Sequence, residues 1–380
     1  MMRASSNGDA NISLSLPKKR SRENRAPLSP LRSALIISVF FSILLICPTQ
    51  ASAQSQSLTI AQAPGGIAFI GTGPYLSQFG TMNALGIGTP AAGVNVIALT
   101  TGALYYTPYT LTGKVNGNHT ITVSALIKTN FTHAAALVLE SCPSSSACNT
   151  SGVFAPMSTA TSVTVMPPTA NNNQPVTVTA GLGILVPDND GAGAFAGTDT
   201  ASITLTLLDE NNNKIATAEI DLTSPTGETV QSAVKLTLGT ATGGLTISPS
   251  NDYAANYGNV NGLGIGPGAG LTTVSVSGGT VYSTPYLINP VFAEFSQTTA
   301  TITAALTTNF AHPAVLQLDD ASALTGPFTQ LTTTPLTITS TAADRSSITR
   351  YLGLFVSNVS GAGAFTGSDT ATITFTMTVP

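Results

Sequence analysis

The sequence predicts an all-β protein: two tandem Ig-like antiparallel β-sandwich domains that follow an N-terminal signal peptide. Three observations lead to this expectation: an apolar leader segment, a long internal duplication, and runs in which apolar and hydroxyl residues alternate. A side-chain period of two is that of a strand with one buried face and one solvated face. No stretch after the leader has the apolar stripe and caps of a helix.

Residues 1–53 have the three parts of a secretory signal peptide. A block of basic residues precedes an apolar run at 34–47, and the small residues at 51–53 suit a signal peptidase. The run is shorter than the ~20 apolar residues that cross a bilayer. We therefore expect cleavage after Ala53, with the membrane contacted only through the cleaved leader. The expected location is extracellular or at the cell surface, with the periplasm as an alternative, and partial likeness to a lipobox leaves lipidation at Cys47 open.

The charge of the exported chain argues against nucleic acid as a partner. Removal of the leader leaves six basic against fifteen acidic side chains, a net charge of −9. Binding to a phosphate backbone needs clustered Lys and Arg, and the six that remain are scattered.

The chain repeats itself once. The segment 191–204 recurs at 361–374 with eleven of fourteen positions identical, and three shorter motifs upstream recur in the same order. Each copy is about 150 residues long, a normal size for one domain. We expect an N-terminal extension at 54–63, a first β-sandwich at 64–224 and a second at 225–380, joined by a linker rich in Pro and Gly.

Period-two runs mark the expected strands. Residues 120–127, 202–207, 300–306 and 371–379 alternate apolar and hydroxyl side chains, and the polar segment 209–214 is typical of a hairpin turn. An outer-membrane barrel is the competing all-β architecture. Its aromatic girdles and regular ten-residue strands are not found here.

Cys142 and Cys148 are expected to form a disulfide. They are the two cysteines of the chain after the leader, and an even count in an exported protein is typical of a disulfide. The bond would stabilise the fold by roughly 2 kcal/mol. A metal or redox site is the alternative, although the spacing is wider than C-x-x-C.

The repeated segment Gly-Ala-Gly-Ala-Phe-x-Gly-x-Asp is expected to be a structural turn. Its glycines permit tight backbone turns, its phenylalanine would enter the core, and its aspartate would accept backbone N–H groups. A ligand site is the alternative. The residues concerned are Gly191, Gly193, Phe195 and Asp199 in the first copy, and Gly361, Gly363, Phe365 and Asp369 in the second.

A calcium site in the first copy is a weaker hypothesis. The run from Asp188 through Asp190 resembles the start of a calcium loop, and Asp199 stands at position twelve. The second copy lacks both of the first two carboxylates. A plain exposed turn is the competing interpretation, and no metal ligand set is assigned beyond it.

Nothing in the sequence predicts an enzyme or a cofactor. His133 and His312 are equivalent in the two copies, but no paired Cys or carboxylate stands at ligand spacing, so we expect them to bond within the scaffold. The serine-elbow pattern G-x-S-x-G is absent. Tyrosines could form a sugar-binding platform, although the chain has no tryptophan. Sequons for N-glycosylation occur at Asn118, Asn130, Asn149 and Asn358.

Two features resemble a known class of proteins. Phe79-Gly80 and Tyr257-Gly258 near the start of each copy, and the closing Gly-x-Asp-Thr-Ala-x-Ile-Thr strand, are similar to exported bacterial fimbrial and spore-coat-U-type β-sandwiches. The resemblance implies a structural or adhesive role at the cell surface.

We therefore expect a non-enzymatic secreted or cell-surface structural or adhesive protein of a coat, appendage or adhesion layer. Its expected partners are further copies of itself or other surface proteins. The segment 54–62 is a candidate donor strand for a neighbour's sheet edge, or else a flexible tail. The alternative function is an extracellular carbohydrate- or calcium-dependent binding module.

Overall fold

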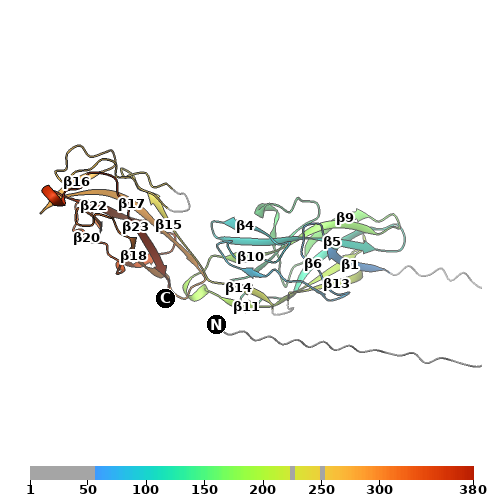
Figure 1. The fold of residues 1–380 in the computed structure, drawn as a ribbon. Helices are drawn as coiled ribbons and strands as arrows, with labels where there is room; N and C mark the ends of the chain where they lie inside the picture. Colours follow the sequence, from blue (N-terminus) through green and yellow to red (C-terminus); the bar gives the residue numbers. More distant parts are fainter. Residues whose placement is uncertain (1–55, 223–226, 249–252) are drawn as a thin grey trace, which may run out of the picture. The chain divides into compact units, whose positions relative to one another are not determined.

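The computed structural model describes residues 56–222, 227–248 and 253–380 (Figure 1). The expected signal peptide and Cys47 lie outside these residues. The described chain is built of strands and three short 3-10 turns, which confirms the predicted all-β class. No helix in the described part is long and apolar enough to cross a membrane.

The first fourteen strands form module 1, which contains three sheets. One has the order β1-β5-β10-β7-β8 with β4 also on β5, the second is β2-β13-β12-β6-β9, and the small third is β11-β14-β3. Its strands are β1 (Ser57–Gln62), β2 (Tyr75–Leu76), β3 (Thr81–Met82), β4 (Asn95–Leu99), β5 (Gly102–Lys114), β6 (Thr120–Thr129), β7 (Val138–Cys142), β8 (Ala155–Pro156), β9 (Val163–Ala170), β10 (Val176–Pro187), β11 (Gly197–Asp199), β12 (Ala201–Leu208), β13 (Lys214–Leu222) and β14 (Glu228–Val230), with 3-10 turns η2 (Ser151–Val153) and η3 (Gly191–Gly193).

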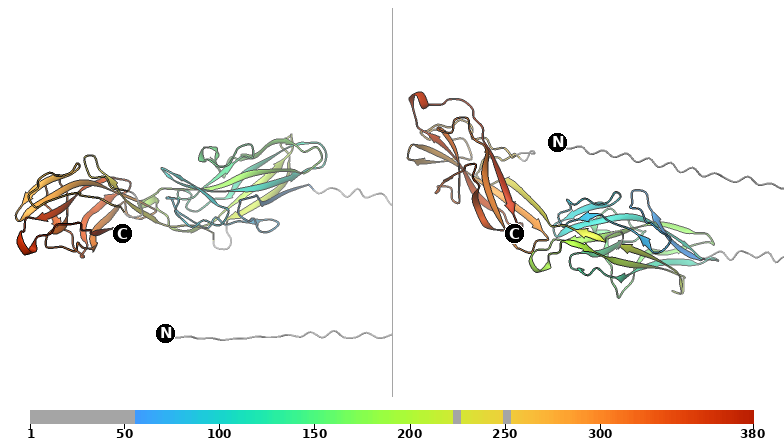
Figure 2. Two further views of the ribbon diagram at one scale, coloured as in Figure 1. Left: turned by 45° about the horizontal axis from the view of Figure 1, so that its top comes forward. Right: turned by 60° about the horizontal axis from the view of Figure 1, so that its bottom comes forward.

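The remaining nine strands form module 2, which contains two sheets. The larger has the order β15-β17-β22-β19-β20 with β16 also on β17, and the smaller is β21-β18-β23. The strands are β15 (Ala233–Thr240), β16 (Thr272–Val276), β17 (Gly279–Ala293), β18 (Thr299–Thr308), β19 (Leu316–Ala321), β20 (Thr329–Gln330), β21 (Leu336–Ala343), β22 (Ile348–Ser357) and β23 (Thr372–Thr378), with the 3-10 turn η4 (Gly361–Gly363). The strands of each module can be followed by colour in Figure 2.

Alternation of side chains creates the core between the sheets. Along β6 every second residue from Ile121 to Ile127 is buried, and Thr122 and Ser124 between them lie on the other face of the strand. Tyr105 and Tyr282 are equivalent and fully buried. The Tyr105 hydroxyl both accepts from the Asn83 N–H and donates to the Asn83 carbonyl, so a polar atom in the core is satisfied.

The strand lists of the two modules match except for five strands. The pairs β1/β15, β5/β17 and β10/β22 have equivalent neighbours, and β12 and β23 pair with the equivalent strands β6 and β18, but β2, β3, β11, β13 and β14 occur in module 1 alone among the described residues. Three of these five strands lie within residues 197–230. They also place the boundary between the modules later in the chain than expected. β14 pairs with β3 and β11, so module 1 continues past the expected boundary at 224.

The segment expected as an N-terminal extension is a strand of the sandwich. β1 pairs antiparallel with β5 over six residues, and its Leu58 and Ile60 are buried. β15 makes the same pairing with β17 in module 2. The expectation that residues 54–62 form a free donor strand or tail is therefore wrong for Ser57–Gln62, because one side of this strand pairs with β5 and its apolar side chains are buried in module 1.

Candidate functional site

The outer edge of β23 is the most unusual feature of the second module. β23 pairs with β18 on one side, and no residue in the described ranges pairs with its other side. Its counterpart β12 lies between β6 and β13. An unpaired edge presents a row of backbone N–H and C=O groups to whatever approaches it. We call this edge of β23 the open edge.

The register in module 1 tells which side chains would stand beside the open edge. β13 places Ile220 opposite Ile203, and Ala218 opposite Leu205. The duplication makes Ile373 and Phe375 the counterparts of Ile203 and Leu205. A strand in the place of β13 would therefore cover Ile373 and Phe375.

Burial confirms that this place is empty among the described residues. The β12 residues Ile203, Leu205 and Leu207 are at most 1% exposed, whereas their three counterparts in β23 are only partly buried. Exposure also differs between β1 and its counterpart β15. Leu58 and Ile60 of β1 are buried, whereas Leu236 and Leu238 of β15 are only partly buried. The counterparts in β23 are Ile373, Phe375 and Met377.

A tyrosine that lies beside β13 in module 1 has a more exposed counterpart in module 2. Tyr75 pairs in parallel with Ile220 of β13 and is 6% exposed. Its counterpart Tyr253 is 38% exposed. Of the eight large apolar side chains that are exposed among the described residues, six lie in module 2: Val234, Tyr253, Leu263, Ile265, Val276 and Val359.

The repeated Gly-Ala-Gly-Ala-Phe segment forms the same turn in both modules. Gly191 and Gly361 begin η3 and η4 with φ of +67° and +80°, a conformation that favours glycine. Phe195 and Phe365 follow each turn and are half-buried, so neither is fully enclosed in a core.

Each phenylalanine of this turn stacks on a histidine. The ring centroids of Phe195 and His133 are 3.8 Å apart, and those of Phe365 and His312 are also 3.8 Å apart. The histidine Nδ1 lies 2.9 Å from Asp199 Oδ2 in module 1, and the equivalent distance to Asp369 is 3.0 Å. The histidine and the aspartate are 66 residues apart in module 1 and 57 apart in module 2. A search for short motifs in the sequence therefore does not find these pairs.

The two aspartates of this turn are held ionised by their surroundings. Asp369 accepts the N–H groups of Ala311, His312 and Thr370. Desolvation alone would raise the pKa of Asp369, but these donors and the His312 ring outweigh it and lower the pKa to about 2. The same balance lowers the pKa of Asp199. The cluster fastens the turn before β12 or β23 to the loop after β6 or β18.

The three candidate calcium residues have separate partners. Asp188 pairs with Arg345, Asp190 accepts the Phe295 N–H at 3.1 Å, and Asp199 bonds to His133. Across the described residues, no group of three or more His, Cys, Asp or Glu side chains is placed to hold a metal ion.

Cys142 and Cys148 form a disulfide. The bond joins the end of β7 to the following loop, and Cys142 is fully buried. Gly181 of β10 lies directly beneath, where a Cβ would come within 3.0 Å of Cys148. The disulfide therefore packs on a strand that has no side chain at that point.

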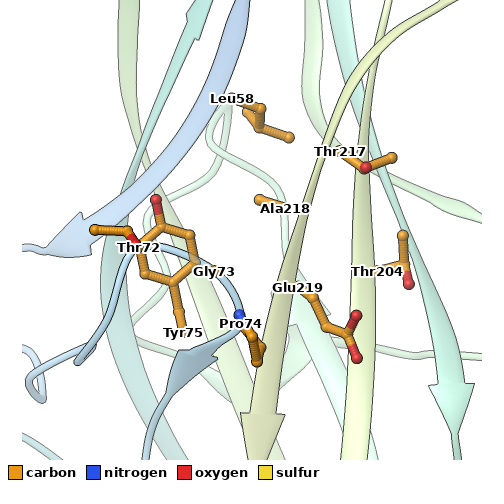
Figure 3. A pocket seen from close by; sticks show the side chains of 9 residues that line it. All are labelled: Leu58, Thr72, Gly73, Pro74, Tyr75, Thr204, Thr217, Ala218 and Glu219. Atoms are coloured by element: carbon orange, nitrogen blue, oxygen red, sulfur yellow. The ribbon is translucent and has the colours of Figure 1, made fainter.

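A shallow hollow of about 280 Å³ lies on module 1 (Figure 3). Thr204 and Thr217 of β12 and β13, Thr72, and the Glu219 carboxylate line it together with the Gly73-Pro74 turn. Glu219 is 2.6 Å from the Lys128 Nζ, so its charge is already paired. The hollow offers hydroxyl groups rather than an apolar cavity.

Comparisons with known proteins find distant likenesses in solved structures alone. No family model matches the chain, and no curated protein matches it. The CupB6 tip adhesin from Pseudomonas aeruginosa is similar at a TM-score of 0.32 and 9% identity, over 85% of this chain and 95% of that one.

A tip adhesin of CFA/I fimbriae, solved with a chaperone, is similar at a TM-score of 0.21 and 14% identity, over 85% of this chain and 91% of that one. The N-terminal domain of PorA is similar at a TM-score of 0.23 and 10% identity, over 46% of this chain and 97% of that one. The solved structures that are similar thus include fimbrial tip adhesins.

Proposed function

We propose that the protein is a non-enzymatic structural or adhesive component of a cell surface or secreted layer, and that it joins its neighbours by strand addition at the open edge. The single observation that supports this function is the unpaired side of β23 above a partly exposed core. Strand addition supplies affinity through main-chain hydrogen bonds and specificity through alternate side chains.

The pairing of β13 with β12 in module 1 shows which kind of strand would fit the open edge of β23. It would run antiparallel to β23 and place apolar side chains opposite Ala371, Ile373 and Phe375, as β13 places Leu222, Ile220 and Ala218 opposite β12. Covering these residues and Tyr253 removes apolar surface from water at about 25 cal/mol per Å². We infer that the partner is a strand of another surface chain with this alternation.

A labelled synthetic peptide with the sequence of residues 214–222 tests the proposal on the intact protein. We expect saturable binding with a Kd in the micromolar range, measured by fluorescence anisotropy. A peptide with Ile220→Asp should bind at least tenfold more weakly, because a carboxylate would enter the core. A peptide with Glu219→Gln is the matched control, because that side chain points away from the core and should leave the Kd unchanged.

Association of the intact protein is a second test of the same proposal. The protein should self-associate or capture a surface partner in sedimentation runs at rising concentration, and the unlabelled peptide should compete. Equal binding of all three peptides would contradict the proposal. So would the absence of any binding by a well-folded protein.

The hydroxyl-lined hollow of module 1 favours carbohydrate binding as the second candidate. Thr72, Thr204 and Thr217 present hydroxyl groups beside a carboxylate, which suits the hydroxyls of a sugar. A glycan array with wild type and Thr217→Val would test it. Unchanged binding by the variant would remove the hollow from consideration.

A further inference from the structure

A second unusual arrangement lies at the contact between the η3 loop of module 1 and the end of β17 in module 2. Four backbone N–H groups fasten it, and one of them is that of Phe295, which donates to Asp190 Oδ1 at 3.1 Å. The Gly191 N–H donates to the Phe295 carbonyl at 2.8 Å, and the Glu294 N–H donates to the Asn189 carbonyl at 2.6 Å. The Phe195 N–H donates to Glu294 Oε2 at 2.6 Å. We call this contact the joint.

Glu294 is at the centre of the joint and is 3% exposed. Its φ is +64°, and the equivalent residue of module 1 is Gly117 with φ +90°. A glycine would therefore satisfy the backbone better than a glutamate does. Its Oε1 atom is buried without a hydrogen-bond partner. Glu294 therefore has an unfavourable backbone conformation and a buried oxygen without a partner. Local folding does not explain why a carboxyl group is present at this position.

The charges around Glu294 are unbalanced. Asp188 and Asp190 approach it from the loop before η3, and Asp344 and Arg345 belong to the turn between β21 and β22. Arg345 pairs with Asp188, and its Nε lies 3.3 Å from Asp344 Oδ2. The second oxygen of Asp188 is buried without a partner. One guanidinium thus faces four carboxyl groups, which cannot all ionise without cost in a poorly solvated place.

Protons relieve that imbalance. Desolvation raises the pKa of Glu294 to about 7, although the Phe195 N–H opposes it, and the charges of Asp190 and Asp188 raise it further. Desolvation likewise raises the pKa of Asp190 to about 6. Both groups therefore change charge between mildly acidic and neutral solution. Among the described residues this cluster is not one that could hold a metal ion.

We propose that the joint is a proton-controlled latch, in which protonated Glu294 keeps the η3 loop fastened to module 2 and ionised Glu294 releases it. The sign follows from linkage. A carboxyl group whose pKa is raised in the fastened state favours that state below its ordinary value near 4.5, and loses the advantage as pH rises to about 7. Between these limits one proton changes the fastening equilibrium by up to tenfold per pH unit.

The equivalent loop of module 2 lacks the parts of the latch. Asn358 and Ser360 stand where module 1 has Asp188 and Asp190, although η4 repeats the geometry of η3. The turn is therefore a shared feature of both modules, and the carboxyl groups are added at the joint. This separates the latch from the structural role of the repeated segment.

Amide hydrogen exchange on the intact protein tests the latch. Peptides that cover residues 188–196 and 290–296 should be protected at pH 5 and at least tenfold less protected at pH 8, after correction for the intrinsic exchange rate. Glu294→Gln imitates the protonated group and should keep protection at both values. Glu140→Gln, which changes a buried carboxyl group of β7 that pairs with β8 and β10, is the matched control and should behave as wild type at the joint.

Two results would overturn the latch. One is protection of wild type that does not change with pH, and the other is an unchanged pH response in folded Glu294→Gln. If Glu294→Gln fails to fold, Asp190→Asn should reduce the pH response, and a full response would refute the proposal. Recovery of protection at pH 8 by added Ca²⁺, and its loss with chelator, would mean that a cation and not a proton closes the joint.

Discussion

The two modules share nine strands and most of their turns, yet one core is closed and the other is open along one side. β12 and β23 have the same alternation of apolar and hydroxyl residues, and both pair with an equivalent strand. Leu205 is nevertheless fully buried, while Phe375 is only partly buried. The comparison teaches that a strand's pattern specifies which side chains could be buried. The strand beside it determines whether they are.

The largest effect should come from placing a charge in the strand that closes module 1. Ile220→Asp would put a carboxylate at a 1% exposed site without a partner, and we expect a loss of about 4 kcal/mol or more in the free energy of unfolding. Urea denaturation measures it. The exposed neighbour Thr217→Asp should change stability by less than about 0.5 kcal/mol. Similar losses of unfolding free energy in the two variants would contradict the conclusion that β13 closes the core of module 1.

A matched pair of truncations should sharpen the comparison. Leu205→Ala should cost about 3 kcal/mol, because it empties a fully buried site, and Phe375→Ala should cost about 1 kcal/mol, because the ring is only partly buried. Differential scanning calorimetry of the two variants measures the contrast. Saturating 214–222 peptide should increase the cost of Phe375→Ala. If the two costs are equal without peptide, the core of module 2 is closed.

A smaller difference should follow from the disulfide, which module 2 lacks. Replacing Cys142 and Cys148 together with serine should lower the stability of module 1 by about 2 kcal/mol, and module 2 should be unaffected. Thermal unfolding with and without reductant measures this. Parallel shifts of both modules would mean that they unfold as one unit.

The smallest effect concerns the turn that the modules share. The depressed pKa of Asp369 contributes stability that is fully present above its ordinary value of 3.8 and is lost as pH falls towards about 2. Asp369→Asn should flatten this acid dependence, and Asp199→Asn should do the same in module 1, where the pKa is also lowered. Acid titration followed by circular dichroism checks it. A steep acid transition that survives in both variants would assign it to other groups.

Much of the fold could be predicted from the sequence because its signals are local. The alternation in 120–127 and 371–379 predicts strands, and β6 and β23 lie there. The even count of cysteines after the leader predicts a disulfide between Cys142 and Cys148, and the structure contains it. The prediction that segment 54–62 is a free donor strand or tail was wrong, because alternation in a short strand does not reveal which strand pairs with it. Ser57–Gln62 pair with β5 of the same module.

The candidate sites were less predictable because their parts are distant in the chain. Glu294 meets Phe195 across 99 residues, and His133 meets Asp199 across 66. No spacing rule links such positions, so the joint and the histidine clusters emerge only after the strands are arranged. One signal was available in the sequence: the second copy has Asn358 and Ser360 where the first has Asp188 and Asp190, so the two carboxylates belong to the first copy alone.

The sequence by itself determined that the chain is duplicated, that it is built of strands with one apolar face, and where its disulfide forms. Each of these depends on neighbouring residues or on identity between distant segments. The tertiary structure alone decided that module 1 is closed by β13, that β23 keeps an open edge, and that Glu294 is buried among carboxyl groups. The physical reason is that burial and pKa depend on what lies across space from a side chain, whereas strand periodicity depends on the residues beside it in the chain.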